Sequence, residues 1–215
     1  MSVPDISRQI GGLVEVTEDI MDAYGSVKRL CGLPEAFQEV SKCLPLVEQT
    51  LQDAKSWAKR LKSAGDTIAL ERVLYSCNEK ANKLREIFKQ ISEISKDQYD
   101  SSLYREIIVK QDKQRVETLM DGILEDLGAL VTHNIYPAEM QRSAEPLAQA
   151  RRELAEVSPS LADSDLADEP RAARQYGDNN CQYNLFGSGN QQVAGGHYFE
   201  AKGDQNFGMI PSKEL

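Results

Sequence analysis

Apolar residues recur at alternating spacings of three and four along most of the first 157 residues, and this spacing restricts the fold more than any other feature. Side chains three and four positions apart lie on one face of an α-helix. The first segment, about 5–31, is therefore predicted to be one amphipathic helix, with Gly32 in the usual position beyond its C-terminus. Its apolar face carries Ile6, Ile10, Leu13, Ile20, Tyr24, Val27 and Leu30.

The same spacing predicts helices over residues 34–61, 66–91 and 104–130, the last as one continuous helix. Pro45 lies inside the second helix and is expected to kink it, because proline lacks the N–H of a helical hydrogen bond. A weaker fifth helix, interrupted by a proline, is expected over 138–157. Long amphipathic helices joined by short connections bury their apolar faces most economically against one another. The predicted fold class is all-α, an antiparallel bundle of four to five helices.

Composition limits the partners and the compartment. The net charge is −9 and Lys and Arg are scattered, which does not support a nucleic-acid-binding surface. No apolar run approaches the ~20 residues of a membrane-spanning helix. The four cysteines have no CxxC spacing and are interpreted as reduced thiols of a cytoplasmic protein; they are Cys31, Cys43, Cys77 and Cys181.

No catalytic or metal-binding motif is recognised. The chain contains no GxxxxGK[ST], GxSxG or HExxH pattern, and its two histidines, His133 and His197, stand apart. Acidic clusters such as 18-EDIMD-22 lie on regular amphipathic helices and are interpreted as solvated faces. We therefore expect no enzymatic activity, no cofactor and no metal, with an enzyme of unrecognised site as the alternative.

The composition changes after residue 157. Residues 158–174 are polar and contain proline, which predicts a flexible linker. The following stretch, 175–208, holds seven of the fourteen glycines, five Asn, five Gln and six aromatic residues. Such composition is typical of a disordered tail, but Asn and Gln ladders and stacked aromatic rings also stabilise cross-β assemblies. The candidate templating residues are Phe186, Gly187, Gly189, Asn190, Gln191, Gly203, Asp204, Gln205, Asn206, Phe207 and Gly208.

Three blocks resemble one fungal family. They are 32-GLPEAFQEVSKCLPLVEQTLQDA-54, 77-CNEKANKLREIFKQI-91 and 113-KQRVETLMDGILEDLGALV-131. They resemble the SesA domain, which is found at the N-terminus of NACHT and other STAND-type P-loop NTPases, and the resemblance spans roughly residues 5–135. SesA-like domains are similar to the HeLo and HeLo-like bundles of fungal incompatibility proteins. The resemblance therefore implies a role in regulated cell death.

The resemblance also implies roles for the two ends of the chain. Proteins of this network carry amyloid signalling motifs that a NACHT or STAND receptor with a similar motif templates, so homo-oligomers are expected on activation. In HeLo-like domains the first helix enters a membrane, which makes Ile6, Ile10, Leu13, Ile20 and Tyr24 candidates for membrane or partner contact. Here that helix also carries Glu15, Glu18, Asp19 and Asp22, and burying each charge in hydrocarbon costs ~2.5–3.5 kcal/mol.

The expected organisation is a SesA-like bundle over 1–136, an accessory helix over 137–157, a linker over 158–174 and a prion-like tail over 175–215. The expected function is that of a non-enzymatic effector or adaptor in receptor-controlled cell death or heterokaryon incompatibility. It would be cytoplasmic, with relocation to the plasma membrane on activation as an open possibility. The alternative is a binding module that inhibits or decoys a SesA-containing NACHT receptor.

Overall fold

The computed structural model describes residues 3–58, 67–94, 97–133 and 138–166, and the backbone of 190–192 and 198–200. Contacts divide the chain into two units, Met1–Ala167 and Asp168–Leu215. In the described part of the first unit, the long helices are α1 (Val3–Val27), α2 (Glu35–Ala58), α3 (Thr67–Ile94), α5 (Val116–Thr132) and α7 (Ala144–Glu156). The short helices are α4 (Ser101–Val109), α6 (Ala138–Gln141) and α8 (Asp163–Leu166).

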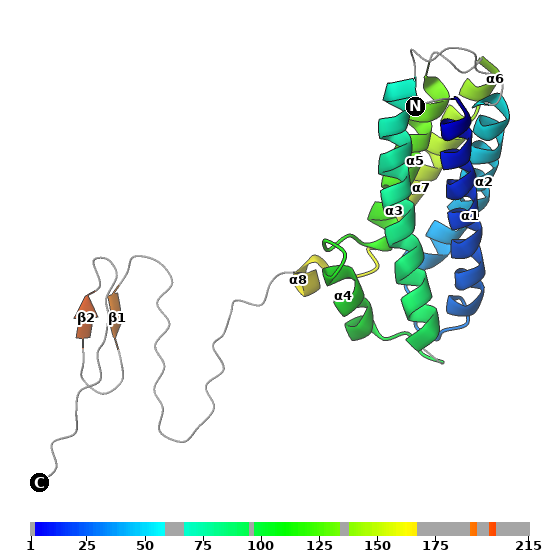
Figure 1. Ribbon diagram of the computed structural model, residues 1–215. Helices are drawn as coiled ribbons and strands as arrows, with labels where there is room; N and C mark the ends of the chain where they lie inside the picture. Colours follow the sequence, from blue (N-terminus) through cyan, green and yellow to red (C-terminus); the bar gives the residue numbers. More distant parts are fainter. Residues whose placement is uncertain are drawn as a thin grey trace, which may run out of the picture. The chain divides into compact units, whose positions relative to one another are not determined.

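The long helices run side by side in alternating directions (Figure 1). Helix α1 packs against α2 and α3, and α5 packs against the same two helices. Helix α7 lies against α5 and α2, and so adds a fifth long helix to the bundle. The apolar faces meet in one core, because burying them together removes the most apolar surface from water. The predicted all-α antiparallel bundle is confirmed.

The prediction of one continuous helix over 104–130 is wrong. The structure has α4 and α5, separated by residues 110–115. Asp112 and Lys113 have φ angles of 57° and 59°, in the left-handed region, where a right-handed helix cannot continue. The Lys113 N–H donates to the Ile108 carbonyl at 2.8 Å and closes α4. This segment contains neither Gly nor Pro, so the sequence gives no sign of the break.

The fifth predicted helix is also divided, but not at its proline. It consists of α6 and α7, and the break falls at Arg142 and Ser143. Pro146 instead lies in the first turn of α7. Backbone N–H groups in the first turn have no helical partner, so the missing N–H of proline costs little there. In α2, the helix runs without interruption through Pro45.

Residues 158–166, which we name the strap, are packed on the bundle, so the predicted flexible linker is wrong for these residues. Ser160 and Leu161 are buried. The Ser160 hydroxyl forms a 2.7 Å hydrogen bond with the Tyr104 hydroxyl, and the Ser160 N–H donates to the Glu117 carboxylate at 3.0 Å. Residues 167–174 of the predicted linker lie outside the described residues.

An aromatic cluster closes the end of the bundle near α4. The ring of Phe37 lies 5.5 Å from that of Phe88, 5.8 Å from that of Tyr99 and 5.3 Å from that of Tyr104, centroid to centroid. The two connections at this end are joined by backbone hydrogen bonds, since Cys31 N–H donates to Asp97 and Tyr99 N–H donates to Cys31. Helix α4 thus contacts α2 through the rings of Tyr104 and Phe37, which meet edge-on.

Replacing Leu44 with alanine is expected to lower the free energy of unfolding by ~2–5 kcal/mol, because the side chain is 1 % exposed and its removal leaves a cavity. Gln52→Ala, at an exposed position of the same helix, is the control and should change it by less than ~0.5 kcal/mol. Urea denaturation followed by circular dichroism measures both. Equal midpoints for the two variants would contradict the assignment of Leu44 to the core.

The left-handed backbone at Lys113 predicts opposite responses to two substitutions. Lys113→Val should lower the free energy of unfolding by ~1–2 kcal/mol, because a β-branched side chain clashes with its backbone at this φ. Lys113→Gly should cause no such loss, because glycine adopts this conformation freely. The same urea titration compares them, and a valine variant as stable as the glycine variant would show that the turn does not need a left-handed residue.

Candidate functional site

The proposed membrane or partner residues of α1 face the interior of the bundle. Ile6, Ile10, Leu13 and Ile20 are each at most 1 % exposed. Tyr24 is partly buried and meets the ring of Phe88 edge-on, with centroids 6.0 Å apart. The five residues therefore lie together on one face, and α2 and α3 cover that face in this state.

The acidic residues of α1 lie toward solvent. Glu15, Glu18 and Asp22 are exposed, and Asp19 is half-buried. The Asp19 carboxylate lies 3.3 Å from both the Arg85 guanidinium and the Lys89 ammonium of α3. Exposed pairs of this kind contribute about 0–1 kcal/mol each, so burial of the apolar face holds α1 in place more than these charges do.

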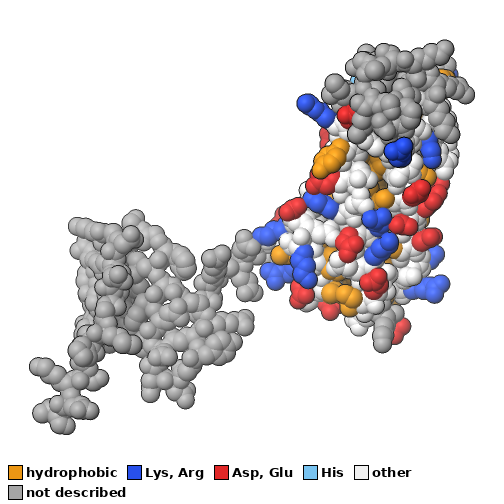
Figure 2. Space-filling model, in the orientation of Figure 1, with side chains coloured by type: hydrophobic (Ala, Val, Ile, Leu, Met, Phe, Trp, Pro, Cys, Tyr) orange, Lys and Arg blue, Asp and Glu red, His pale blue; other side chains and the backbone are white. Residues whose placement is uncertain are grey.

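Charged side chains of both signs are interspersed over the face of the bundle in Figure 2. Two pairs join helices across that surface. The Lys80 ammonium of α3 lies 2.6 Å from the Asp126 carboxylate of α5. The Arg151 guanidinium of α7 donates to both oxygens of Asp121, at 2.8 and 3.1 Å, and this carboxylate raises the pKa of Arg151. These two ion pairs link α3 to α5 and α5 to α7.

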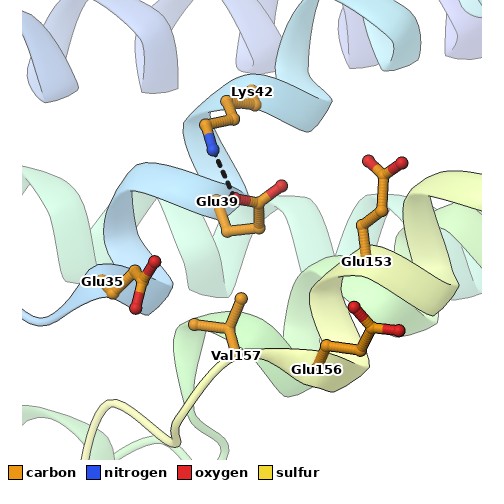
Figure 3. Close-up of a pocket in the computed structure, with 6 residues that line it drawn as sticks. All are labelled: Glu35, Glu39, Lys42, Glu153, Glu156 and Val157. Carbon is orange, nitrogen blue, oxygen red and sulfur yellow. Dashed lines mark hydrogen bonds and ion pairs between the residues drawn. The ribbon is translucent and has the colours of Figure 1, made fainter.

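An open pocket of about 370 Å³ lies between α2 and the end of α7. Figure 3 shows Glu35, Glu39 and Lys42 on one side, with Glu153, Glu156 and Val157 on the other. The Lys42 ammonium donates to Glu39 at 2.7 Å, and that carboxylate is largely buried. The remaining carboxylates give the pocket a negative field, which suits a cationic group. The sequence did not reveal it, because its two sides come from distant segments.

The chemistry available in the described residues is limited. No group of three or more His, Cys, Asp or Glu side chains there is placed to hold a metal ion. Cys43 and Cys77 are buried free thiols, and burial raises their pKa values to about 11 and about 12. Both stay protonated at neutral pH and are poor nucleophiles. Cys31 is an exposed free thiol, and Cys181 lies outside the described residues.

Two of the candidate templating residues lie in a described strand. Strand β1 (Asn190–Gln192) contains Asn190 and Gln191 and pairs antiparallel with β2 (Tyr198–Glu200). The register places Asn190 opposite Glu200 and Gln191 opposite Phe199. A two-stranded pair of this length is marginally stable by itself. The other candidates lie outside the described residues: Phe186, Gly187, Gly189, Gly203, Asp204, Gln205, Asn206, Phe207 and Gly208.

Among the described helices, none is long and apolar enough to cross a membrane.

Burial of the α1 face predicts that Ile10→Asp lowers the free energy of unfolding by more than ~3 kcal/mol, because it places an unpaired charge in the core. Glu15→Ala, on the exposed face of the same helix, is the matched control and should change it by less than ~0.5 kcal/mol. Thermal and urea unfolding measure the difference. If Ile10→Asp unfolds at the wild-type midpoint, α1 is not part of the resting core.

The comparisons with known proteins bear on the bundle. The family model of SesA, described as the N-terminal domain on NACHT_NTPase and P-loop NTPases, matches residues 10–130. The match extends from α1 to near the end of α5, and includes the first two blocks whose sequences resemble SesA and the third up to residue 130. Neither a curated protein nor a solved structure matches the chain. Because the matched range covers more than half of the 215 residues, the chain belongs to the SesA family.

Proposed function

We propose that this chain is a non-enzymatic signalling protein, an effector or adaptor in a cell-death or heterokaryon-incompatibility pathway under the control of a NACHT or STAND receptor. The observation that carries the proposal is the SesA match over residues 10–130, since the domain is one that occurs on NACHT NTPases. A chain with the same domain is suited to act in the same signalling context. The role is exercised through contacts between proteins.

The bundle transmits the signal in this proposal. The apolar face of α1 is already occupied by α2 and α3, which favours an adaptor over a helix that inserts into a membrane at rest. Contact with the plasma membrane would require α1 to leave the core and carry Glu15, Glu18 and Asp22 with it. The cost of burying those charges in hydrocarbon adds to the cost of opening the core.

The C-terminal stretch, 175–208, receives the signal in this proposal. Its two G-(N/D)-Q units begin at Gly189 and Gly203, and β1 lies in the first of them. Among the described residues the sheet has only these two strands, and unpaired N–H and C=O groups at the edge of such a sheet accept a further strand. A receptor motif of similar sequence would add there, with Asn and Gln side chains forming ladders between copies. The chain then oligomerises through this stretch.

The proposed templating predicts that proline in either unit abolishes fibril growth. Full-length Gln191→Pro and Gln205→Pro, seeded with preformed wild-type aggregate, should give no thioflavin-positive fibrils, because proline cannot donate to a strand ladder. Gln182→Pro, outside both units, is the control and should still assemble. The melting temperature of the bundle should be the same in all three.

A wild-type chain that stays monomeric at high concentration, even when seeded with a peptide of the receptor motif, would contradict templating. Loss of fibrils in all three proline variants would show that the two units have no special role.

A second candidate function is inhibition of a SesA-containing receptor. The family match favours it, because a separate copy of a receptor's own domain can occupy the contacts that the receptor domain makes. In this case the C-terminal stretch is incidental. Binding of a truncated chain, residues 1–167, to the SesA domain of a NACHT receptor distinguishes the two. Binding and inhibition that survive the truncation favour the decoy, and loss of signalling on truncation favours the effector.

A further inference from the structure

The strap is the described segment that leads from the bundle to the second unit, and it is held mainly by polar contacts. The Arg115 guanidinium pairs with the Asp163 carboxylate, and the Arg105 guanidinium donates to the Asp165 carbonyl. The Arg115 side chain is only 14 % exposed, whereas Asp163 is 94 % exposed, so water screens this pair from the Asp163 side. Leu161 is the one apolar side chain of residues 158–166 that is fully buried. The strap therefore buries little apolar surface for its length.

A polar layer lies beneath the strap. The Tyr104 hydroxyl bonds to Ser160 and also accepts the Val116 N–H, at 3.1 Å. Within the described residues, three buried atoms of this region have no hydrogen-bond partner: Tyr99 Oη, Arg115 Nε and Glu117 Oε2. Burial raises the pKa of Tyr99, and the Tyr104 hydroxyl and the Glu117 carboxylate act in the same direction, so these groups lie close together. Water that enters on opening can bond to all of them, which offsets the contacts that are lost.

Helix α4 depends on the strap. It has only nine residues, too few for a helix to be stable by itself in water. It packs against α3 and against α8, which belongs to the strap, and the Tyr104 ring also packs on Phe37 of α2. Its buried residues are Tyr104, Ile107 and Ile108, and the first of these is the one bonded to Ser160. The left-handed turn at Asp112 and Lys113 joins α4 to α5 and forms a natural hinge.

We propose that the strap is a latch that opens together with α4, as one unit, while α1, α2, α3 and α5 stay folded. The contact between Ser160, Tyr104 and Glu117 sets how often it opens. Opening withdraws Tyr104 from Phe37 and uncovers the aromatic cluster at that end of the bundle. In the sequence, the second unit begins at Asp168, two positions after the last residue of the strap. The inference does not depend on the proposed function.

Hydrogen exchange of the full chain, followed by mass spectrometry in low denaturant, tests the latch. In the wild type, amides of the strap and of α4 are expected to exchange at one common opening rate, faster than the core amides of α3. Ser160→Asp places a charge beside Glu117. It should raise the amide exchange rates of the strap and of α4 about tenfold or more and leave those of α3 unchanged. Ser158→Asp adds the same charge at an exposed position of the strap and should change the exchange rates of the strap and of α4 less than about threefold.

Three results would overturn the latch. One is exchange of the strap and α4 at the rate of α3 in the wild type. Another is acceleration of all three segments alike by Ser160→Asp. The third is an equal effect of the two aspartates. If Ser160→Asp does not fold, Ser160→Ala decides by the same comparison, since it removes only the hydroxyl that bonds to Tyr104.

Discussion

One end of the bundle depends on the hydroxyl of Tyr104, which binds two segments distant in sequence at a single buried point. It accepts the N–H of Val116, at the start of α5, and bonds to Ser160 in the strap. The ring of the same residue packs on Phe37 of α2. A helix start has N–H groups without helical partners, so this acceptor serves where a capping side chain is absent at Arg115. Without it, α4, α5 and the strap would share no common contact.

Elsewhere the bundle is stabilised mainly by burial of apolar side chains, and surface ion pairs between helices contribute little free energy. Helix α1 buries Ile6, Ile10, Leu13 and Ile20. The ion pair between Asp19 of α1 and Arg85 of α3 contributes little free energy by comparison. The same division applies between α5 and α7, where Arg151 binds Asp121 at the rim of the contact. An effector that acts through this bundle must therefore use the polar surface of the bundle, because opening the core would cost the free energy of exposing these apolar side chains.

The two units differ in the interactions that the proposed function assigns to them. The SesA bundle is specified by side-chain packing within one chain. In the proposed function, the Gly-, Asn- and Gln-rich stretch would pair through backbone and amide groups with other copies of the same stretch. The strap ends two residues before the second unit begins, and in the proposed latch it opens with α4 while the other helices stay folded.

The sequence by itself determined the all-α bundle and the SesA family, because the three-four spacing persists wherever helices share a core and the family blocks are local. It also placed the α1 face correctly, since a single periodicity defines it. The break between α4 and α5 could not be predicted, because Asp112 and Lys113 adopt left-handed backbone without glycine, stabilised by the turn that brings Lys83 to Asp112 at 2.8 Å. The acidic pocket and the packing of the strap also needed the tertiary structure. Glu39 and Glu153 come to line one pocket, and Ser160 bonds to Tyr104, only after distant helices have packed. Polar residues such as those of the strap carry no periodic signal of burial.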